Sequence, residues 1–156
     1  MSLRSKIEGD LKSAYLEKRT DEVGALRLLR AAIQNLEIDL KAKKEEINDE
    51  AILEIVSHEA KKRRESIELY EKGNRPELAE KEKKELAFLL GYLPQQLSDE
   101  EIRTKLNELV KNNNAQGISD LGKTMGLAMK ELKGKADGKR VQDILKDVLL
   151  KKISNS

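Results

Sequence analysis

The sequence predicts an all-α protein, and three observations lead to that fold class. Apolar residues recur every three or four positions through most of the 156 residues, which is the spacing of one helix face. Leu, Lys, Glu and Ala are abundant and aromatic residues make up only 3% of the chain, a composition that favours helix over strand. No segment alternates apolar and polar residues with the period of two that marks a strand. We expect a four-helix N-terminal domain followed by a three-helix C-terminal bundle.

The first two helices are predicted to begin after Ser2 and near Thr20. Each of these side chains can accept a hydrogen bond from a free amide in the first helical turn. Behind each cap the apolar residues follow in steps of three or four, as one buried helix face requires. These stripes are Leu3, Ile7, Leu11 and Ala14 in the first helix, and Leu26, Leu29, Ile33, Leu36 and Leu40 in the second.

The third and fourth helices are predicted between Asp49 and Leu90. The third runs from about Asp49 to Lys72, where Gly73 suits the left-handed position that ends many helices. Pro76 is well placed as the first residue of the fourth, because its fixed φ fits a helix and its missing N–H costs nothing there. We expect this helix to end near Leu90.

Pro94 marks the predicted domain boundary, which separates residues 1–93 from residues 94–156. Proline disfavours helical geometry at the preceding residue and donates no backbone hydrogen bond. Beyond it, Ser98 and Glu101 have the spacing of a capping box that opens the fifth helix. The sixth helix should run from Ser119 to about Lys133. The seventh follows Asp137 and buries Val141, Ile144, Leu145, Val148 and Leu149.

Side-chain catalysis has little support in the sequence. The chain contains no cysteine and only one histidine, His58, and its helical neighbours point about 100° apart and cannot converge on one site. Residues 134–139 read GKADGK, one residue shorter than a P-loop, and Arg140 stands where Ser or Thr would bind magnesium. We therefore predict no catalytic residue, no metal and no cofactor, and lean against an enzyme.

The charge and hydropathy patterns exclude a membrane span. No apolar stretch approaches the roughly 18 residues that a spanning helix needs. The first ten residues include acids where a signal peptide requires an apolar run. These observations predict a cytoplasmic protein with no membrane partner.

A basic cluster around residues 133–140 is the candidate nucleic-acid site. A turn with glycines at 134 and 138 presents backbone amides, and the following helix adds its positive dipole end. Such a cluster could hold phosphates without reading bases. An ordinary capped turn with solvated lysines explains the same residues. The candidate site residues are Lys123, Lys133, Lys135, Lys139, Arg140, Gly134 and Gly138.

Two other features leave alternatives open. Gly122 and Gly126 lie four residues apart in the sixth helix, which indicates close approach by a neighbouring helix or, alternatively, by a ligand. Arg30 and Arg63 lie next to apolar stripes. They either form partly buried pairs with acids such as Glu37 or Glu59 across the second and third helices, or mark a binding face.

Several segments together resemble the YqeY-like family. The clearest are LGKTMG at 121–126 and KGKADGKRV at 133–141, supported by ALRLLRAAIQN at 25–35, EAKKRRES at 59–66 and YLPQQLS at 92–98. The resemblance therefore covers most of the chain. The C-terminal domain of this family is similar to the tail domain of the glutamine-dependent aspartyl/glutamyl-tRNA amidotransferase.

This resemblance implies a function as well as a fold. It implies an all-helical, two-domain, bacterial cytoplasmic protein that binds tRNA or RNA as a non-catalytic accessory of tRNA-dependent amidation. A carbon–nitrogen ligase label, with glutamine as amido donor, follows from the shared domain alone. The alternative is a protein-interaction module that docks on an aminoacylation or amidation enzyme. The positions that match the family tail are Gly122, Lys123, Gly134, Lys135, Ala136, Asp137, Gly138 and Val141.

Overall fold

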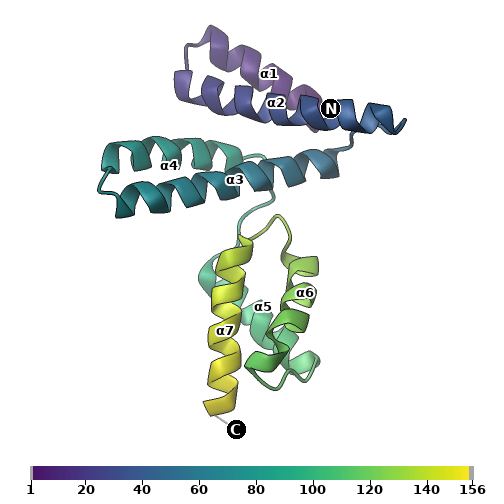
Figure 1. Cartoon of the computed structure of the whole chain (residues 1–156), viewed down its shortest axis with the longest axis vertical. Helices are drawn as coiled ribbons and strands as arrows, with labels where there is room; N and C mark the ends of the chain where they lie inside the picture. Colours follow the sequence, from purple (N-terminus) through teal and green to yellow (C-terminus); the bar gives the residue numbers. More distant parts are fainter. Residues whose placement is uncertain (1, 155–156) are drawn as a thin grey trace. The chain divides into compact units, whose positions relative to one another are not determined.

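The computed structural model describes residues 2–154, with side chains placed as far as Lys151. All regular structure in this range is helical, which confirms the predicted fold class. A single 3₁₀ turn, Ile118–Asp120, precedes the sixth α-helix (Figure 1). The α-helices are α1 (Leu3–Leu16), α2 (Thr20–Ala42), α3 (Asp49–Lys72), α4 (Pro76–Leu90), α5 (Asp99–Asn112), α6 (Leu121–Leu132) and α7 (Gly138–Ser154).

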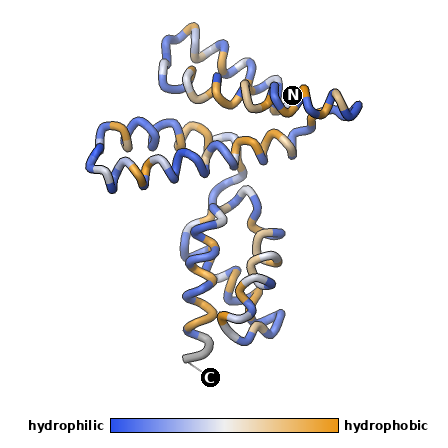
Figure 2. The backbone as a smooth tube through the Cα atoms, viewed as in Figure 1, coloured by the Kyte–Doolittle hydropathy of each residue, from blue (hydrophilic) through white to orange (hydrophobic). Residues whose placement is uncertain are grey.

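Backbone contacts divide the chain into two compact units that meet at the Leu93–Pro94 bond. In the N-terminal unit, α1 pairs with α2 and α3 pairs with α4, and each pair forms a helical hairpin (Figure 1). Hydrophobic positions recur along one side of these helices (Figure 2). The buried cluster between the hairpins consists of Ile7, Leu11, Ala14, Leu26, Leu29, Ile33, Ile52, Val56 and Leu89.

The helix ends of the N-terminal unit agree with the sequence in two places and differ in two. The Ser2 hydroxyl accepts a hydrogen bond from the Ser5 amide, 3.1 Å away, and Pro76 is the first residue of α4. Thr20, predicted as a cap, is instead the first helical residue and makes no capping bond. The left-handed residue after α3 is Asn74, with φ of 56°, whereas the predicted Gly73 has φ of −83°.

Three further helix connections also place a non-glycine residue in the left-handed region. Lys18 follows α1, Lys44 follows α2 and Asn114 follows α5, with φ between 52° and 61°. Asparagine tolerates this conformation through its short polar side chain, but lysine has no such compensation. Reversals that glycine usually supplies are therefore made by Lys and Asn at four positions of this chain.

Charged side chains are buried between α3 and α4. The Arg63 Nε atom lies 3.1 Å from Oε2 of Glu85 and 3.5 Å from Oε2 of Glu82, both on α4. Within α3, Nη2 of Arg63 lies 3.8 Å from Oε2 of Glu59. The Arg63 side chain is 12% exposed, so this residue forms the partly buried pair that the sequence suggested. Its partners across the helix contact belong to α4 and not to α2.

Arg30 has a different partner from the one expected. Its Nη1 atom lies 3.9 Å from Oε2 of Glu8 on α1, and Glu37 instead binds Arg4 at 3.1 Å. The Arg30 side chain is 39% exposed. Arg30 therefore links α1 to α2 near the surface, and the expected pairing with α3 is wrong.

The C-terminal unit packs α5, α6 and α7 around an apolar core, whose buried members come from all three helices. Ser98 and Glu101 form the predicted capping box at the start of α5, with both reciprocal bonds at 3.2 Å. The sixth helix begins two residues later than predicted, because residues 118–120 form the 3₁₀ turn. The core consists of Ile102, Leu106, Val110, Ala115, Ala128, Leu132, Val141, Ile144, Leu145, Val148 and Leu149.

The two glycines inside α6 do not mark a close helix contact. A Cβ atom added to Gly122 or Gly126 would meet no atom within 4 Å outside its own helix turn. The expectation that a neighbouring helix crosses α6 closely at these positions is therefore wrong. Both glycines face open space.

Candidate functional site

The turn between α6 and α7 holds most of the basic residues that the sequence singled out. Gly134 has φ of 79°, which reverses the chain after α6, and Gly138 begins α7. The Lys135 amide donates to the carbonyl of Leu132 at 2.9 Å and closes the turn. Lys133 and Lys135 therefore lie on this connection, and Lys139 and Arg140 lie in the first turn of α7.

This turn is bound to the segment that opens the C-terminal unit. The Leu97 amide donates to the Lys135 carbonyl at 2.9 Å, and the Gln96 side-chain amide donates to the Gly134 carbonyl at 2.8 Å. The guanidinium of Arg140 donates to the Asp99 carboxylate in the first turn of α5. These bonds give the turn a structural role, and they engage part of its charge inside the unit.

Lys123 lies away from this cluster. It is ten residues before Lys133, near the beginning of α6, which places it about 15 Å away along the helix axis. There it lines a small cavity of about 120 Å³ with Asn113, Asp120 and Thr124. The structure therefore brings four of the five predicted cations together and leaves Lys123 at the other end of α6.

A second surface, which the sequence analysis missed, lies on the solvent side of α2. Seven exposed positions follow one another in steps of three or four and fall within a sector of about 80°. None of them is charged, although 38% of the chain is, and Leu28 and Ile38 are 53% and 67% exposed. We call this surface the α2 outer face; it consists of Thr20, Gly24, Leu28, Ala31, Asn35, Ile38 and Ala42.

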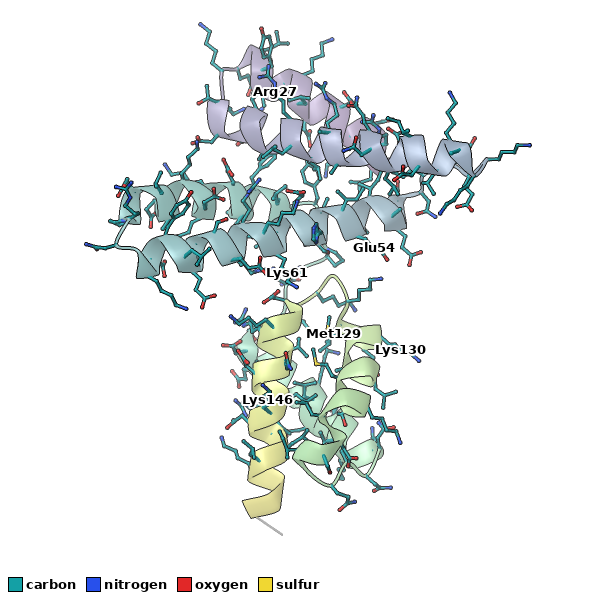
Figure 3. The ribbon with its side chains drawn as sticks, viewed as in Figure 1. Arg27, Glu54, Lys61, Met129, Lys130 and Lys146 are labelled. Carbon is teal, nitrogen blue, oxygen red and sulfur yellow. The ribbon has the colours of Figure 1, made fainter. Side chains whose placement is uncertain are left out.

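The corresponding face of α3 shows what a solvated helix looks like in this protein. Its exposed sector carries four charged side chains at helical spacing, together with the uncharged His58 and Leu69; the charged ones are Glu54, Lys61, Glu65 and Lys72. Figure 3 shows Glu54 and Lys61 extending from the ribbon of α3. The absence of charge on the α2 outer face is therefore particular to α2, and not a general property of the long helices.

A furrow between α1 and α2 borders the α2 outer face. It encloses about 220 Å³ and is lined by the apolar side chains of Leu11 and Tyr15. The charged side chains that line it include Arg27, which is labelled in Figure 3. Tyr15 is 63% exposed. Within the part of the chain with placed side chains, Lys12 and Arg27 form no ion pair, whereas Glu8 already binds Arg4 at 2.5 Å. The furrow therefore combines exposed apolar surface with two unpaired cations.

Residues 2–151 contain no group of three or more His, Cys, Asp or Glu side chains placed to hold a metal ion. No helix among the described residues has the length and hydropathy of a membrane span.

Comparison with known proteins identifies relatives along most of the chain. The family described as Yqey-like protein matches residues 4–149. The chain is 28% identical to "Altered inheritance of mitochondria protein 41, mitochondrial" of Pyrenophora tritici-repentis, over 92% of this chain and 79% of that one. It is 30% identical to the protein of the same name from Vanderwaltozyma polyspora, over 96% and 80%. The protein of that name from Lachancea thermotolerans is 32% identical to the chain, over 68% of this chain and 57% of that one.

These relatives overturn the functional expectations. They are named as mitochondrial proteins of eukaryotes, so the expectation of a bacterial, cytoplasmic protein is wrong. The likeness of the tail domain suggested tRNA binding, a carbon–nitrogen ligase association and, alternatively, docking on an aminoacylation or amidation enzyme. The relatives are named instead for altered inheritance of mitochondria, which does not support these expectations. A shared domain carries a fold between proteins without carrying the chemistry of the larger enzyme. With a family match over residues 4–149, the chain belongs to the YqeY-like family.

Proposed function

We propose that this protein is a binding module whose N-terminal unit holds an amphipathic helix of another protein against the α2 outer face. The observation that carries the proposal is the uncharged exposed sector of α2. Exposed helix faces in a highly charged chain ordinarily carry charge, as α3 does here. Contiguous exposed apolar surface with a polar rim is typical of protein–protein contacts.

The shape of the surface suits a helix. Gly24 and Ala31 lie near the centre of the face, and a Cβ atom added to Gly24 would meet nothing within 4 Å. Small side chains at the centre let a second helix approach closely, while Leu28 and Ile38 supply apolar contact on either side. The face extends over 23 residues of α2, or about 33 Å at 1.5 Å per residue, so six turns of a partner helix can lie along it.

The charge at the border specifies the partner further. Lys12 and Arg27 lie at the furrow beside the face. A partner helix with an apolar stripe and an acidic edge would place its stripe on Leu28 and Tyr15 and its carboxylates near these cations. This arrangement is the helix-in-groove mode of peptide recognition.

A designed peptide tests this function. An 18-residue helix with leucines at steps of three and four and glutamates along one edge is expected to bind the full chain. Leu28→Asp and Ile38→Asp should each weaken binding roughly tenfold or more, because burying one such side chain contributes about 1.5–3 kcal/mol. Fluorescence anisotropy of the labelled peptide measures the affinity.

Leu69→Asp is the matched control. Leu69 is 69% exposed on α3, outside the α2 outer face, so its replacement should leave the affinity unchanged. Equal loss in all three variants, or no binding by the parent chain, would contradict the proposal. Sedimentation of the parent chain alone distinguishes a second copy as the occupant, since a dimer broken by Leu28→Asp would reassign the face to self-association.

We propose further that the two units fold as separate domains, with four helices in residues 1–93 and three in residues 94–156. Each unit has its own apolar cluster, and Pro94 stands at the division. The isolated C-terminal fragment of about 60 residues buries a modest core but should melt cooperatively. Far-UV circular dichroism is the measurement, and a random-coil spectrum would contradict the separation.

A further inference from the structure

A groove in the C-terminal unit lies between α5 and α7 and is independent of the α2 outer face. It encloses about 520 Å³, within the range of roughly 300–1,000 Å³ typical of ligand pockets. Two nearly buried valines form its floor. The remaining lining side chains are cations and amides: Arg103, Asn107, Lys111 and Asn114 on and just after α5, and Lys151 on α7.

Two of the cations are held in place by one carboxylate. Arg103 Nη1 lies 2.7 Å and Lys151 Nζ lies 3.2 Å from the same Oδ2 atom of Asp147. These two hydrogen bonds hold the pKa of Asp147 below its ordinary value, so the carboxylate stays charged near neutral pH. Asp147 thereby fixes a cation from each helix at the groove, and preorganised groups bind a ligand at lower entropic cost.

The other polar side chains of the groove have no partner within the part of the chain whose side chains are described. Asn107 and Lys111 follow Arg103 in steps of four, so these three residues lie on one side of α5, and Asn114 lines the groove just beyond the end of that helix. Among the described residues, the side chains of Asn107, Lys111 and Asn114 make no hydrogen bond or ion pair. A side-chain amide both donates and accepts, so an asparagine can bind a carboxylate or a peptide backbone.

We propose that this groove binds the C-terminal end of an acidic peptide. The terminal carboxylate lies at Lys111 and Asn114. An acidic side chain three residues earlier lies at Arg103 and Lys151, which bind the same Asp147 oxygen and therefore lie close together. Arg103 and Lys111 are eight residues apart, or about 12 Å along α5. Three residues of extended peptide span about 10 Å, and Asn107 lies between the two ends with a free amide for the backbone.

The spacing of the groups favours a peptide over an inorganic anion. A phosphate ion can reach the charges at one end of the groove but not both ends and the intervening amide. An extended ligand with two carboxylates engages all of them. Capture of a chain terminus by a cluster of donors is an established mode of peptide recognition.

Nuclear magnetic resonance titration of the full chain with the acetylated hexapeptide Ala-Ser-Asp-Val-Ala-Asp tests the proposal. The amides of residues 103–114 should shift and saturate. The same peptide with an amidated C-terminus should bind at least about tenfold more weakly, because a hydrogen bond to a charged group is lost. Inorganic phosphate should bind far more weakly and displace little peptide.

Two groove variants and one control complete the test. Lys111→Ala and Asn107→Ala should each reduce the affinity several-fold without changing the melting temperature. Lys146→Ala, an exposed position on α7 outside the groove lining (Figure 3), should leave the affinity unchanged. Equal binding of the amidated peptide, equal binding of phosphate, or no binding by the parent chain would each overturn the proposal.

Discussion

The contact between α3 and α4 and the contact between α5 and α7 join helices with different side chains. Between α3 and α4, Arg63 is enclosed by Glu59, Glu82 and Glu85, all less than one-fifth exposed. Between α5 and α7, the interior is apolar, and Arg103 meets Asp147 at the edge, where both are about 40% exposed.

This difference determines what each contact tolerates. A buried arginine among carboxylates contributes little net stability over an apolar pair, but removing it strands charges that cannot reach water. An exposed ion pair is solvated on both sides, so losing it costs little. The α3–α4 contact should therefore be sensitive to the loss of one charge, and the α5–α7 contact to the loss of apolar volume.

The largest expected effect is that of Arg63→Ala. Without the guanidinium, three carboxylates remain close together with little solvent, and the free energy of unfolding should fall by about 3–5 kcal/mol. Urea unfolding measures it. Lys62→Ala is the matched control, since Lys62 binds Glu59 at 3.1 Å but is 51% exposed, and it should cost under about 1 kcal/mol.

The comparison fails if Arg103→Ala destabilises the chain as much as Arg63→Ala does. It would also fail if Arg63→Ala left the melting temperature unchanged, which would reassign Arg63 to the surface. A variant that replaces Arg63, Glu82 and Glu85 by apolar residues of similar volume should recover most of the lost stability, because the stranded charges are then absent.

Leu145→Ala should have the next largest effect. Leu145 is fully buried in the core of the C-terminal unit, and loss of a buried leucine costs about 2–5 kcal/mol through lost burial and a residual cavity. Amide hydrogen exchange should show faster exchange in α5–α7 with little change in α1–α4. Equal acceleration in both units would contradict the idea that their cores are separate.

A smaller effect is expected from pH, with opposite signs in the two units. Burial and the nearby charge of Glu82 raise the pKa of Glu85, although Arg63 and Lys81 oppose them and Asp21 adds to them. Its protonated form is favoured in the folded state, so Glu85 contributes stability below its ordinary pKa of 4.5. That contribution is lost as the pH rises through the raised value.

Asp147 behaves in the opposite way. Its bonds to Arg103 and Lys151 lower its pKa, so its contribution is present above the ordinary value of 3.8 and is lost as the pH falls through the lowered one. Melting temperatures of the parent, Glu85→Gln and Asp147→Asn between pH 3 and 7 separate the two. On acidification, the parent should become more stable relative to Glu85→Gln. It should become less stable relative to Asp147→Asn.

Local sequence information predicted most of the fold, because helix periodicity and caps depend on neighbouring residues. The Ser98–Glu101 capping box and the start of α4 at Pro76 are examples. The predicted roles of Thr20 as a cap and of Gly73 as the left-handed residue are wrong, because a helix can begin or end without the residue type that favours that position. The partners of Arg63 on α4 can be identified only when it is known that α3 packs against α4. Residue spacing within one helix does not contain that information.

The candidate sites were less predictable. The turn of residues 133–140 was visible because its glycines and cations are adjacent in sequence. The α2 outer face was missed because the periodicity of α2 was traced through its buried stripe, although seven uncharged positions at helical spacing could have revealed it. The α5–α7 groove combines Lys151 with residues well over 30 positions earlier, so only the packed bundle shows it.

The left-handed residues after α1, α2, α3 and α5 bear on how this protein can evolve. Lysine in that conformation costs about 1–2 kcal/mol relative to the right-handed region, and glycine would relieve that strain at some cost in unfolded-state entropy. Replacing Lys18 or Lys44 by glycine should therefore increase the stability of the fold. Because such exchanges change neither core nor binding surface, a lineage could use them to compensate a destabilising change made elsewhere for function.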